Sequence, residues 1–402
     1  MTASELRLPD APWRTRSGMS RLLAVLGADA GETRYVGGCV RDTLLGLPVA
    51  DVDLATRLTP EEVLARLGKA RIKAVPTGIA HGTVTAVVAG APVEVTTLRR
   101  DVATDGRRAT IAYTGDWRED AARRDFTINA LLADPLSGEI FDYFGGREDL
   151  AARRVRFIGA PLSRIAEDHL RILRFFRFHA RFGAGAPDAA ALEACAARAN
   201  DLMALSRERI ADELLKLLGL PDPAPTVALM IAQGIFRPVL PEIVSADRLA
   251  ALIAAETAGG IAPDPIRRLA ALLPPEQKVA EAVAARLRLS KRQARRLASA
   301  ADPALDAPEP LAYRIGNAEA VDRFLLAGTS GIDLAALEAW PRPRLGLGGG
   351  DLIGMGLEAG PLVAKTLQAI EREWAASGFS VDKEKVRALA RRHVDQALRS
   401  SQ

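Results

Sequence analysis

The spacing of hydrophobic positions changes near residue 155 of this chain. Before that point short β-branched runs alternate with short helical stretches, and after it nearly every segment repeats its apolar residues with helical spacing. Strands are expected at Thr33–Val36, Val49–Leu54, Thr83–Val88, Pro92–Thr97 and Ile140–Tyr143, and helices at Val40–Leu45, Pro60–Leu67 and Asp125–Leu132. The pattern predicts an α/β or α+β domain around a small sheet, followed by a long helical region.

Clusters of proline and glycine divide the helical region. They fall at Gly183–Pro187, Pro221–Pro225, Pro238–Pro241, Gly259–Pro265, Pro274–Pro275, Asp302–Pro310 and Pro341–Gly350. The first thirty residues carry Pro9, Pro12 and a short apolar helix pattern, and are expected to pack as an extension on the neighbouring sheet domain. We therefore divide the chain into residues 1–30, 31–150, 151–220, 221–300 and 301–402.

The length of 402 residues favours two to four domains over a single hydrophobic core. Hydrophobic residues make up 49% and charged residues 26%, the balance of a globular protein. No apolar run reaches the ~18–20 residues of a membrane span, and the N-terminus lacks the architecture of a signal peptide. Cys39 and Cys195 lie far apart without metal-ligand spacing. We expect a cytoplasmic protein without a membrane anchor, a disulfide framework or a zinc site.

Positive charge is concentrated in two segments, although the net charge is only +4. Arg153–Arg181 holds eight arginines against two acids, Glu167 and Asp168, and Arg286–Arg296 holds six lysines and arginines and no acid. Clustered cations bind polyanions, because neutralised phosphates release counterions. The alternative for either segment is a solvated helix face. Two such segments in one chain favour a nucleic-acid partner.

A strand-to-helix turn with two glycines lies at Tyr35–Asp42. Gly37 and Gly38 let the backbone approach a ligand closely, and the helix after them offers free N–H groups and the positive end of its dipole. Arg41, in the first turn of that helix, has the fork geometry that binds a triphosphate in a bidentate manner. On its own the turn also fits an ordinary strand-to-helix connection.

Two aspartates, Asp51 and Asp53, come about ten residues after the start of that helix. Side chains two residues apart in an extended strand point to the same face, so these carboxylates are expected to lie together. Paired carboxylates repel unless a cation joins them, and Mg²⁺ takes one or two carboxylates together with substrate phosphates. A solvated turn is the alternative, but the glycine turn upstream favours the metal. Glu94 is either a third acid facing the metals or the outward residue of a half-buried strand.

Five motifs occur in a specific order between residues 35 and 217. They are Gly37-Gly38-Cys39-Val40-Arg41-Asp42 with Asp51-Val52-Asp53, Arg123-Arg124-Asp125-Phe126-Thr127-Ile128-Asn129-Ala130, Asp142-Tyr143-Phe144-Gly145-Gly146 with Asp149-Leu150, Glu167-Asp168-His169-Leu170-Arg171 with Arg174 and Arg177, and Ser206-Arg207-Glu208-Arg209-Ile210 with Glu213 and Lys216. This series resembles the tRNA nucleotidyltransferase and bacterial poly(A) polymerase family, class II, of the polymerase-beta-like superfamily. Beyond about residue 220 the resemblance is loose.

The resemblance implies an α+β fold, in which a small mixed sheet with flanking helices forms a nucleotidyltransferase head that precedes an elongated all-α neck, body and tail. In these terms residues 31–150 are the head, 151–220 the neck with the nucleotide-selecting motif, 221–300 the body and 301–402 an RNA-binding tail.

The implied activity is template-independent addition of CCA to tRNA 3′ ends from CTP and ATP, with Mg²⁺ in a two-metal site. The implied partner is tRNA, contacted at its 3′ end and elbow, and no protein partner is evident. The candidate catalytic acids are Asp51, Asp53 and Glu94, of which Asp51 and Asp53 would hold the metals. The nucleotide would be bound by Gly38, Arg41, Arg124, Asp125, Asn129, Asp168, Arg171, Arg174 and Arg177.

The interval Glu167–Arg177 has the pattern of a helix, which predicts Asp168, Arg171 and Arg174 on one face. A solvated basic face is the alternative. The resemblance implies that Asp168 and Arg171 act as a protein template: the carboxylate accepts from the exocyclic amino group of cytosine or adenine, and the guanidinium donates to the adjacent ring nitrogen. Uracil and guanine present a carbonyl and a ring N–H there, so both contacts would fail.

The nearest alternative is a poly(A) polymerase that adds A tails to RNA, and enzymes that add only A or only CC are further variants. A non-catalytic RNA-binding descendant would be expected to lack Asp51 and Asp53. The chain has no long basic segment for unstructured RNA, although Arg286–Arg296 keeps the poly(A) alternative open. Arg99–Ala109 is charged and weakly patterned, which predicts a mobile loop. In the family a loop here is needed for the change from C to A addition.

Overall fold

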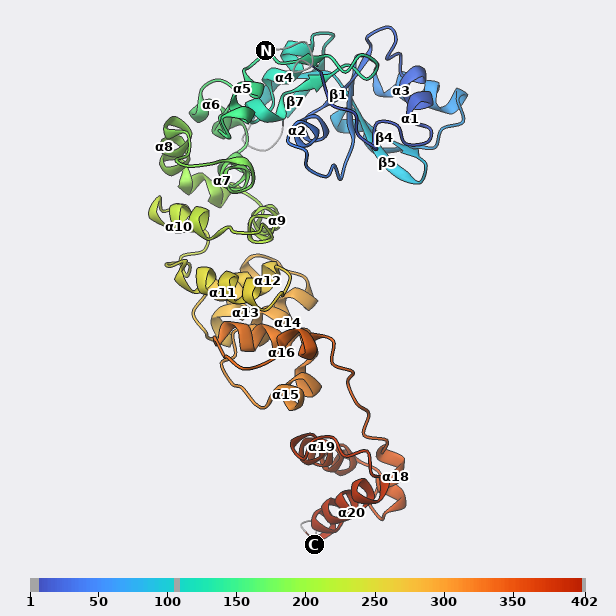
Figure 1. The fold of residues 1–402 in the computed structure, drawn as a ribbon, viewed down its shortest axis with the longest axis vertical. Coiled ribbons are helices and arrows are strands. Elements are labelled where there is room, and N and C mark those ends of the chain that lie inside the picture. The colour runs from blue at the N-terminus through green and yellow to red at the C-terminus, as the bar shows by residue number, and fades with distance from the viewer. Residues whose placement is uncertain (1–6, 105–108, 400–402) are drawn as a thin grey trace. The chain divides into compact units, whose positions relative to one another are not determined.

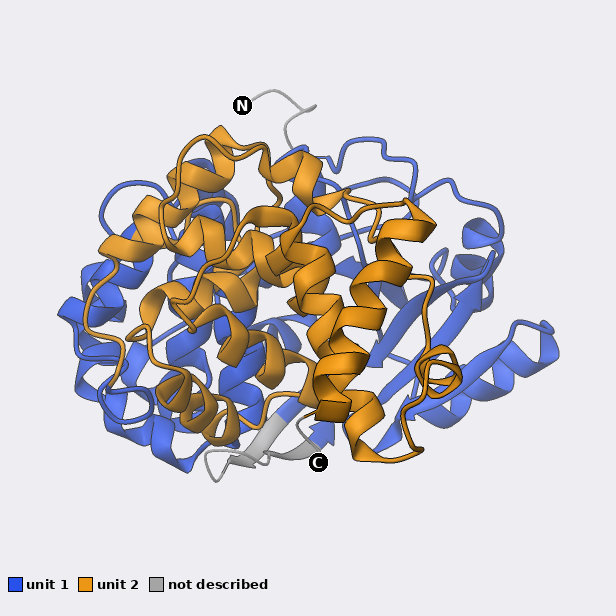
Figure 2. Cartoon of the chain, turned by 90° about the horizontal axis from the view of Figure 1, so that it is seen from below, with its two compact units in different colours: residues 1–217, 225–241 blue, residues 218–224, 242–402 orange. Residues whose placement is uncertain are grey.

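The computed structural model describes residues 7–104 and 109–399. Contacts separate the chain into two units, shown in different colours in Figure 2. Unit 1 is Met1–Leu217 with Pro225–Pro241, and unit 2 is Leu218–Ala224 with Glu242–Gln402. The sheet and all candidate site residues belong to unit 1.

A mixed sheet of seven strands forms the N-terminal part of unit 1 (Figure 1). In spatial order the strands are β3 (Ala74–Gly78), β4 (Thr83–Val88), β5 (Ala91–Thr97), β2 (Asp53–Thr56), β1 (Thr33–Val36), β8 (Leu132–Ala133) and β9 (Ile140–Phe141). Neighbours are antiparallel except β2 and β5, which run parallel. Residues of β4 alternate between half-buried and buried positions, as expected for a strand with one covered face.

Short helices flank the sheet: α1 (Met19–Val25), α2 (Gly38–Leu44), α3 (Pro60–Lys69), α4 (Trp117–Ala122) and α5 (Gly146–Ala151). The start of α3 is specified locally, because Thr59 and Glu62 form a capping box and Pro60 at the first position has no N–H to leave unpaired. Trp117 of α4 packs with Val36 and other sheet residues in one apolar cluster. The helices therefore cover apolar surface of the sheet.

The residues before β1 pack on the head. Leu8 is buried, and the indole N–H of Trp13 donates to Thr43 Oγ1 over 3.0 Å. The Trp13 ring also meets the edge of Tyr35, with centroids 4.7 Å apart. These contacts tie residues 8–13 to α2 and β1.

Five helices complete unit 1: α6 (Pro161–Glu167), α7 (Arg171–Phe182), α8 (Ala189–Ala197), α9 (Arg207–Leu218) and α10 (Ala224–Ala232). A phenylalanine cluster joins α7 to the residues that come after α4. Phe126 lies 4.9 Å from Phe157 and 5.1 Å from Phe178 between ring centroids, and Phe175 stacks on Phe157 at 5.8 Å. Since Asp125 precedes Phe126 and Arg174 precedes Phe175, this apolar packing also brings those charges together.

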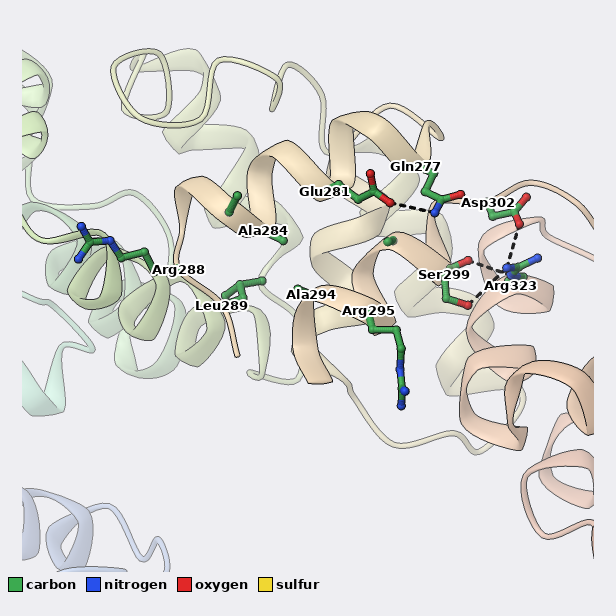
Figure 3. A pocket seen from close by; sticks show the side chains of 12 residues that line it. Gln277, Glu281, Ala284, Arg288, Leu289, Ala294, Arg295, Ser299, Asp302 and Arg323 are labelled. Atoms are coloured by element: carbon green, nitrogen blue, oxygen red, sulfur yellow. Dashed lines mark hydrogen bonds and ion pairs between the residues drawn. The ribbon is translucent and has the colours of Figure 1, made fainter. Parts of the chain in front are cut away.

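Unit 2 is helical, with α11 (Asp247–Ala258), α12 (Pro265–Leu272), α13 (Gln277–Arg286), α14 (Lys291–Ala300), α15 (Pro308–Ile315), α16 (Asn317–Leu326), α17 (Leu334–Glu338), α18 (Gly349–Gly354), α19 (Pro361–Ala376) and α20 (Lys383–Arg399). A cavity of about 680 Å³ lies against α13 and α14, and Figure 3 shows its lining. No helix among residues 7–104 and 109–399 is long and apolar enough to cross a membrane.

The predicted fold class is confirmed: a mixed sheet with flanking helices precedes a mostly helical remainder. The bounds expected for β1 and β4 are those observed. The strand expected at Val49–Leu54 instead runs over Asp53–Thr56 as β2, so Asp51 lies just before it.

Two expected helices were wrong. Asp125–Leu132 contains only a 3₁₀ turn at Thr127–Asn129, after which Leu132 enters β8. The apolar residues of this segment are buried, and a short run of buried apolar residues can also occur in a segment that is not helical. The helix expected across Glu167–Arg177 is interrupted, because α6 ends at Glu167 and α7 begins at Arg171.

The segment expected to be a mobile loop forms two paired strands, β6 (Arg99–Thr104) and β7 (Ala109–Tyr113). The two strands pair antiparallel, whereas the weak sequence pattern had predicted an irregular loop. Residues 105–108, on which the rest of that prediction falls, lie outside the described residues.

Candidate active site

The acid pair sits where β2 begins. Asp53 is the first residue of the strand and lies directly opposite Glu94 of β5 in the parallel register. Val52 is buried, whereas Asp51 is exposed and Asp53 half-buried. Both aspartates are thus more exposed than Val52 between them, and the register sets Glu94 next to Asp53. A metal held jointly by Asp51 and Asp53 stays a prediction.

The charges at the start of β2 repel one another. The pKa of Asp53 is raised to about 6. Burial is the largest cause, the negative charges of Glu94 and Asp51 add to it, and the positive charge of Arg124 opposes it. A carboxylate of this kind is stabilised by a bound cation, because the cation removes the repulsion and replaces lost hydration. Within the described part of the chain no three His, Cys, Asp or Glu side chains form a ready metal cluster. Asp51 and Asp53 therefore fit a site that substrate oxygens complete.

The glycine turn faces the half-buried Arg124. Gly37 adopts φ 71° and ψ −123°, a conformation that favours glycine, and a Cβ added there would lie 3.5 Å from Arg124 Nη1. Arg124 Nη2 donates to Asp120 Oδ2 over 3.0 Å. Arg124 Nε is buried and has no hydrogen-bond partner among the described residues. A buried donor without a partner is costly, which fits a site that an anionic ligand completes.

Arg41 is buried beside the same turn. Its Nε donates to Asp42 Oδ1 over 2.7 Å and its Nη1 donates to Asn129 Oδ1. The guanidinium also lies 4.1 Å from the centroid of the Phe182 ring. Since a Cβ added at Gly38 would come within 3.7 Å of Arg41 Nη2, the guanidinium reaches the turn from its buried side. Its predicted contact with the triphosphate stays a prediction.

Asp125 links the head to α7. Its Oδ1 accepts from the backbone N–H of Phe126 and from Asn129 Nδ2, and its Oδ2 accepts from Arg174 Nε over 2.8 Å. Burial opposes ionisation of Asp125, but the charge of Arg174 and these hydrogen bonds outweigh it and hold its pKa below the usual range. Asp125 and Asn129 thus bind each other, Arg174 and Arg41; that they organise a nucleotide site stays a prediction.

The predicted template residues occupy the break between α6 and α7. Asp168 is extended, with φ −153° and ψ 107°, and its two oxygens accept from Leu170 N–H and from Arg209 Nη2. Arg171 Nη1 donates to Glu167 Oε2 over 2.6 Å and to the Arg164 carbonyl over 2.9 Å. The two residues are thus held by different partners and not by each other, contrary to a shared helical face.

Asp168 and Arg171, the predicted template residues, keep hydrogen-bonding groups that no residue among 7–104 and 109–399 occupies. Besides its two Nη1 bonds, Arg171 donates from Nη2 to the Arg123 carbonyl over 2.9 Å, so three of its five N–H groups are used. The Asp168 carboxylate has about four acceptor positions, of which two are occupied. Donors and acceptors for a nucleobase edge therefore remain.

Arg174 and Arg177 converge on a carboxylate that the sequence motif did not assign. Arg177 Nε donates to Glu213 Oε2 over 2.6 Å, and Arg174 Nη1 lies 3.7 Å from Glu213 Oε1. Glu213 is buried, in α9. Arg174 thus bridges Asp125 and Glu213, and any role with phosphates is a second function of the same side chain.

Sequence reasoning missed Asp120, and it named Arg209 and Glu213 only as part of the fifth motif, without giving them a role in holding the site. Asp120 is buried and accepts from both Arg123 and Arg124. Its spacing of three and four residues from those arginines was a usable signal for ion pairs in a helical turn, although no helix was predicted there. Arg209 and Glu213 act 41 and 36 residues away from their partners, and no local pattern reports such a contact.

The basic segment Arg286–Arg296 divides into paired and exposed cations. Arg286 binds Glu242, and Arg296 binds Asp264 and Asp322. Lys291, Arg292 and Arg295 are exposed on α14, and Arg295 extends away from the helices in Figure 3. The surface available to a polyanion is therefore smaller than the count of charges suggested.

The fold and this acid-and-arginine site define a nucleotidyltransferase. Residues 33–156 match the family described as Poly A polymerase head domain, and residues 187–247 match the probable RNA and SrmB-binding site of polymerase A. The chain belongs to the family of CCA tRNA nucleotidyltransferases, which its full-length similarity to known members shows.

The relatives and structures are similar over most of the chain. CCA tRNA nucleotidyltransferase 1, mitochondrial, of Mus musculus is 32% identical over 406 residues, covering 95% of this chain and 92% of the relative. The Homo sapiens protein is 31% identical over 409 residues with the same coverage. The crystal structure of the Bacillus stearothermophilus CCA-adding enzyme in complex with CTP is 28% identical and covers 96% of this chain and 100% of that one, with a TM-score of 0.75.

Proposed function

We propose that this protein adds C, C and A in turn to the 3′ end of tRNA, with CTP and ATP as substrates. The observation that carries the proposal is the pair Asp168 and Arg171, each held in place and each with unused groups, in the same unit as the acids at the start of β2. The names of the full-length relatives, CCA tRNA nucleotidyltransferases, support the same conclusion.

Base selection depends on the free groups of the template pair. An ionised Asp168 accepts from the exocyclic amino group of cytosine or adenine, and an unused N–H of Arg171 donates to the neighbouring ring nitrogen. Uracil and guanine would set a carbonyl against the carboxylate and an N–H against the guanidinium. Because the site is partly desolvated, these unpaired contacts cost far more than they would in water.

Asp51 and Asp53 would hold Mg²⁺, with Glu94 as a further acid beside them. When bound there, Mg²⁺ would make the RNA 3′-hydroxyl more acidic and stabilise charge on the phosphate oxygens. The donor set fits a hard cation, since it consists of carboxylate oxygens that repel one another. Two metals in this site, as the family resemblance implies, remain part of the proposal.

The remaining residues position the reactants. The 3′-oxygen of the RNA attacks the α-phosphorus of the nucleotide, and the bond to the bridging oxygen of the β-phosphate breaks, which releases pyrophosphate. Arg124, with its unpartnered Nε beside Gly37, and Arg41 behind Gly38 would hold the triphosphate. Arg174 and Arg177, anchored on Glu213, would hold it from α7 or adjust the template. Catalysis then consists mainly of positioning and electrostatic stabilisation.

The RNA partner is tRNA, bound at its 3′ end in unit 1 and at its elbow further along the chain. Recognition of an elbow proceeds through shape and backbone contacts, for which the exposed cations of α14 are suited. We retain the division into head (31–150), neck (151–220), body (221–300) and tail (301–402) as part of the proposal. A cytoplasmic location also belongs to it, and the mouse and human relatives carry the word mitochondrial in their names.

The test is extension of a tRNA transcript that ends at its discriminator base, with CTP alone, ATP alone, or both. We expect two additions with CTP alone, and three with both nucleotides followed by arrest. A long ladder with ATP alone would instead identify a poly(A) polymerase. Extension by a single A only on transcripts already ending in CC would identify an A-adding enzyme.

A further inference from the structure

Asp168 is not held by a helix. It lies in the break between α6 and α7, in an extended conformation, three residues before α7 begins. A residue inside a helix has its side-chain direction restricted by the neighbouring turns. Asp168 lacks that restriction, so the direction of its carboxylate depends on the few groups that bind it.

The carboxylate has two partners of different kinds. Oδ1 accepts from the backbone N–H of Leu170 over 3.1 Å, and Oδ2 accepts from Arg209 Nη2 over 2.8 Å. The Leu170 contact is local and moves together with the segment that carries Asp168. Arg209 comes from α9, 41 residues further along the chain, and is the contact that ties the carboxylate to a separate element.

The helix that carries Arg209 is itself well anchored. Ile210 and Leu214 of α9 are buried, and Glu213 binds Arg177 of α7. The Arg209 and Asp168 side chains are 33% and 28% exposed, so their ion pair is partly shielded from water. A charge-assisted hydrogen bond in such surroundings is shorter and stronger than a neutral one, and the planar guanidinium restricts its direction.

The two members of the template pair are therefore fixed independently. Arg171 binds Glu167 and the carbonyls of Arg164 and Arg123, none of which involves Arg209. Loss of the Arg209 guanidinium would free the Asp168 carboxylate, which accepts from the exocyclic amino group of the base. Arg171, which donates to the ring nitrogen, would stay in place. A loosened carboxylate can turn away from the carbonyl of uracil, which removes the repulsion that rejects it.

We infer that Arg209 is a positioning residue for base selection: it fixes the carboxylate of Asp168 and thereby increases the preference of the enzyme for CTP over UTP. The inference rests on the proposed function, because it requires that Asp168 reads the base. Arg209 is assigned no contact with the nucleotide and acts through Asp168 alone.

The test compares Arg209→Gln with the unaltered protein on a tRNA transcript that ends at its discriminator base. We expect the ratio of kcat/KM for CTP to that for UTP to fall at least about tenfold, since an unrestrained acceptor tolerates the wrong edge. Arg209→Lys retains a cation and should recover part of the ratio. A purely structural role would lower both values of kcat/KM together and leave the ratio unchanged, and that result would overturn the inference.

Arg198→Gln is the matched control. Arg198 Nε binds Asp201 Oδ2 over 2.6 Å, with side chains 42% and 29% exposed, in the same unit. Asp201 Oδ2 also lies 3.7 Å from Nδ1 of His169, the neighbour of Asp168, so this variant loosens the surroundings of Asp168 without removing a partner of its carboxylate. This variant should keep the ratio of the unaltered protein. An equal fall in Arg198→Gln would show that general loosening of the helices is responsible, and the inference would be rejected.

A double-mutant comparison isolates the path through Asp168. In an Asp168→Ala background, Arg209→Gln should change the CTP to UTP ratio less than about twofold, because the group that Arg209 positions is gone. An undiminished effect there would mean that Arg209 acts by another route. If the unaltered protein incorporates no CTP, the proposed function fails, and the inference with it. If the unaltered protein prefers CTP and Arg209→Gln does so equally, only the inference fails.

Discussion

Two clusters of arginines and carboxylates in this protein differ in how completely they use their hydrogen-bonding groups. In unit 2, Arg267 and Arg268 are only 2% and 1% exposed, and both bind Glu256. Asp322, also buried, accepts from Arg267 and Arg296. In unit 1, Asp168 and its neighbours are partly exposed and keep donors and acceptors that no described residue occupies.

The difference separates a structural cluster from a binding site. In the cluster around Glu256 and Asp322 each charge is paired with an opposite one. Arg268 additionally donates to the carbonyls of Leu218, Leu220 and Pro221. Such a closed network holds the ends of several segments together but offers nothing to a ligand. The open network around Asp168 is held just as specifically, and its remaining groups are available to a nucleobase. The type and number of charged residues alone do not distinguish the two.

The largest expected effect is at the open site. Asp53→Asn should lower nucleotide transfer by about a thousandfold or more, since about 4 kcal/mol of transition-state stabilisation is lost with the metal ligand. The same change should raise the free energy of unfolding at pH 7.5 without metal by about 1–3 kcal/mol. The reason is that burial, Glu94 and Asp51 penalise the ionised form of Asp53. Urea unfolding measures the free energy of unfolding, and single-turnover extension of tRNA measures the rate of nucleotide transfer. Normal turnover, or a loss of stability, would contradict the assignment.

The closed network should respond in the opposite way. Glu256→Ala leaves Arg267 and Arg268 buried without their shared partner, and should lower the free energy of unfolding by about 3–5 kcal/mol. Transfer by the protein that remains folded at low temperature should be unchanged. The control is Glu242→Ala, whose partner Arg286 is more exposed, with an expected loss of about 1 kcal/mol or less. Equal losses in both variants would show that burial does not distinguish the pairs.

The pH dependence of metal binding sharpens the comparison further. The pKa of Asp53 is raised from 3.8 to about 6, so its carboxylate takes up a proton as the pH falls through 6. Because a metal ligand must be deprotonated, the affinity for Mg²⁺ should fall by about tenfold for each pH unit below 6 and be nearly constant above 7. The Mg²⁺ concentration for half-maximal transfer, measured between pH 5 and 8, gives the curve. A constant value across that range would remove Asp53 from the metal site.

The smallest effect is expected within unit 2, between an exposed cation of the Arg286–Arg296 segment and an exposed cation outside it. Arg292→Glu on α14 should raise the KM for tRNA about two- to fivefold without changing kcat, and reduce the salt dependence of binding by about one counterion. Lys278→Glu on α13 is the control, since Lys278 is exposed but lies outside the Arg286–Arg296 segment. If both variants behave alike, the effect reflects net charge and not a contact at α14.

Several elements of the head could be predicted from the sequence because their signals are local. Short β-branched runs predicted β1 and β4 with their observed bounds, and the helix expected at Pro60–Leu67 begins at Pro60 as α3. The pairing of Asp51 with Asp53 was predicted by their spacing. For Glu94 two alternatives were open, and the parallel register that sets it opposite Asp53 is consistent with an acid beside the candidate metal ligands.

The neck could not be predicted in the same way. The helical pattern across Glu167–Arg177 predicted the apolar face of α7 but not the break between α6 and α7 at Asp168. That break is stabilised in part by Arg209, and the arginines of α7 are held by Glu213. Such partners are brought together only when the phenylalanine cluster around Phe126 packs.

The sequence by itself determined the residue types, their order and the local elements: the glycine turn, the acid pair and the basic helices. Their chemistry depends on side-chain type and short spacing, both of which are visible along the chain. The tertiary structure decided which charges neutralise one another and which remain available, as in the contrast between Arg268 and Arg171. Electrostatic partners are chosen by distance in space and by burial, and these arise only after distant segments have packed.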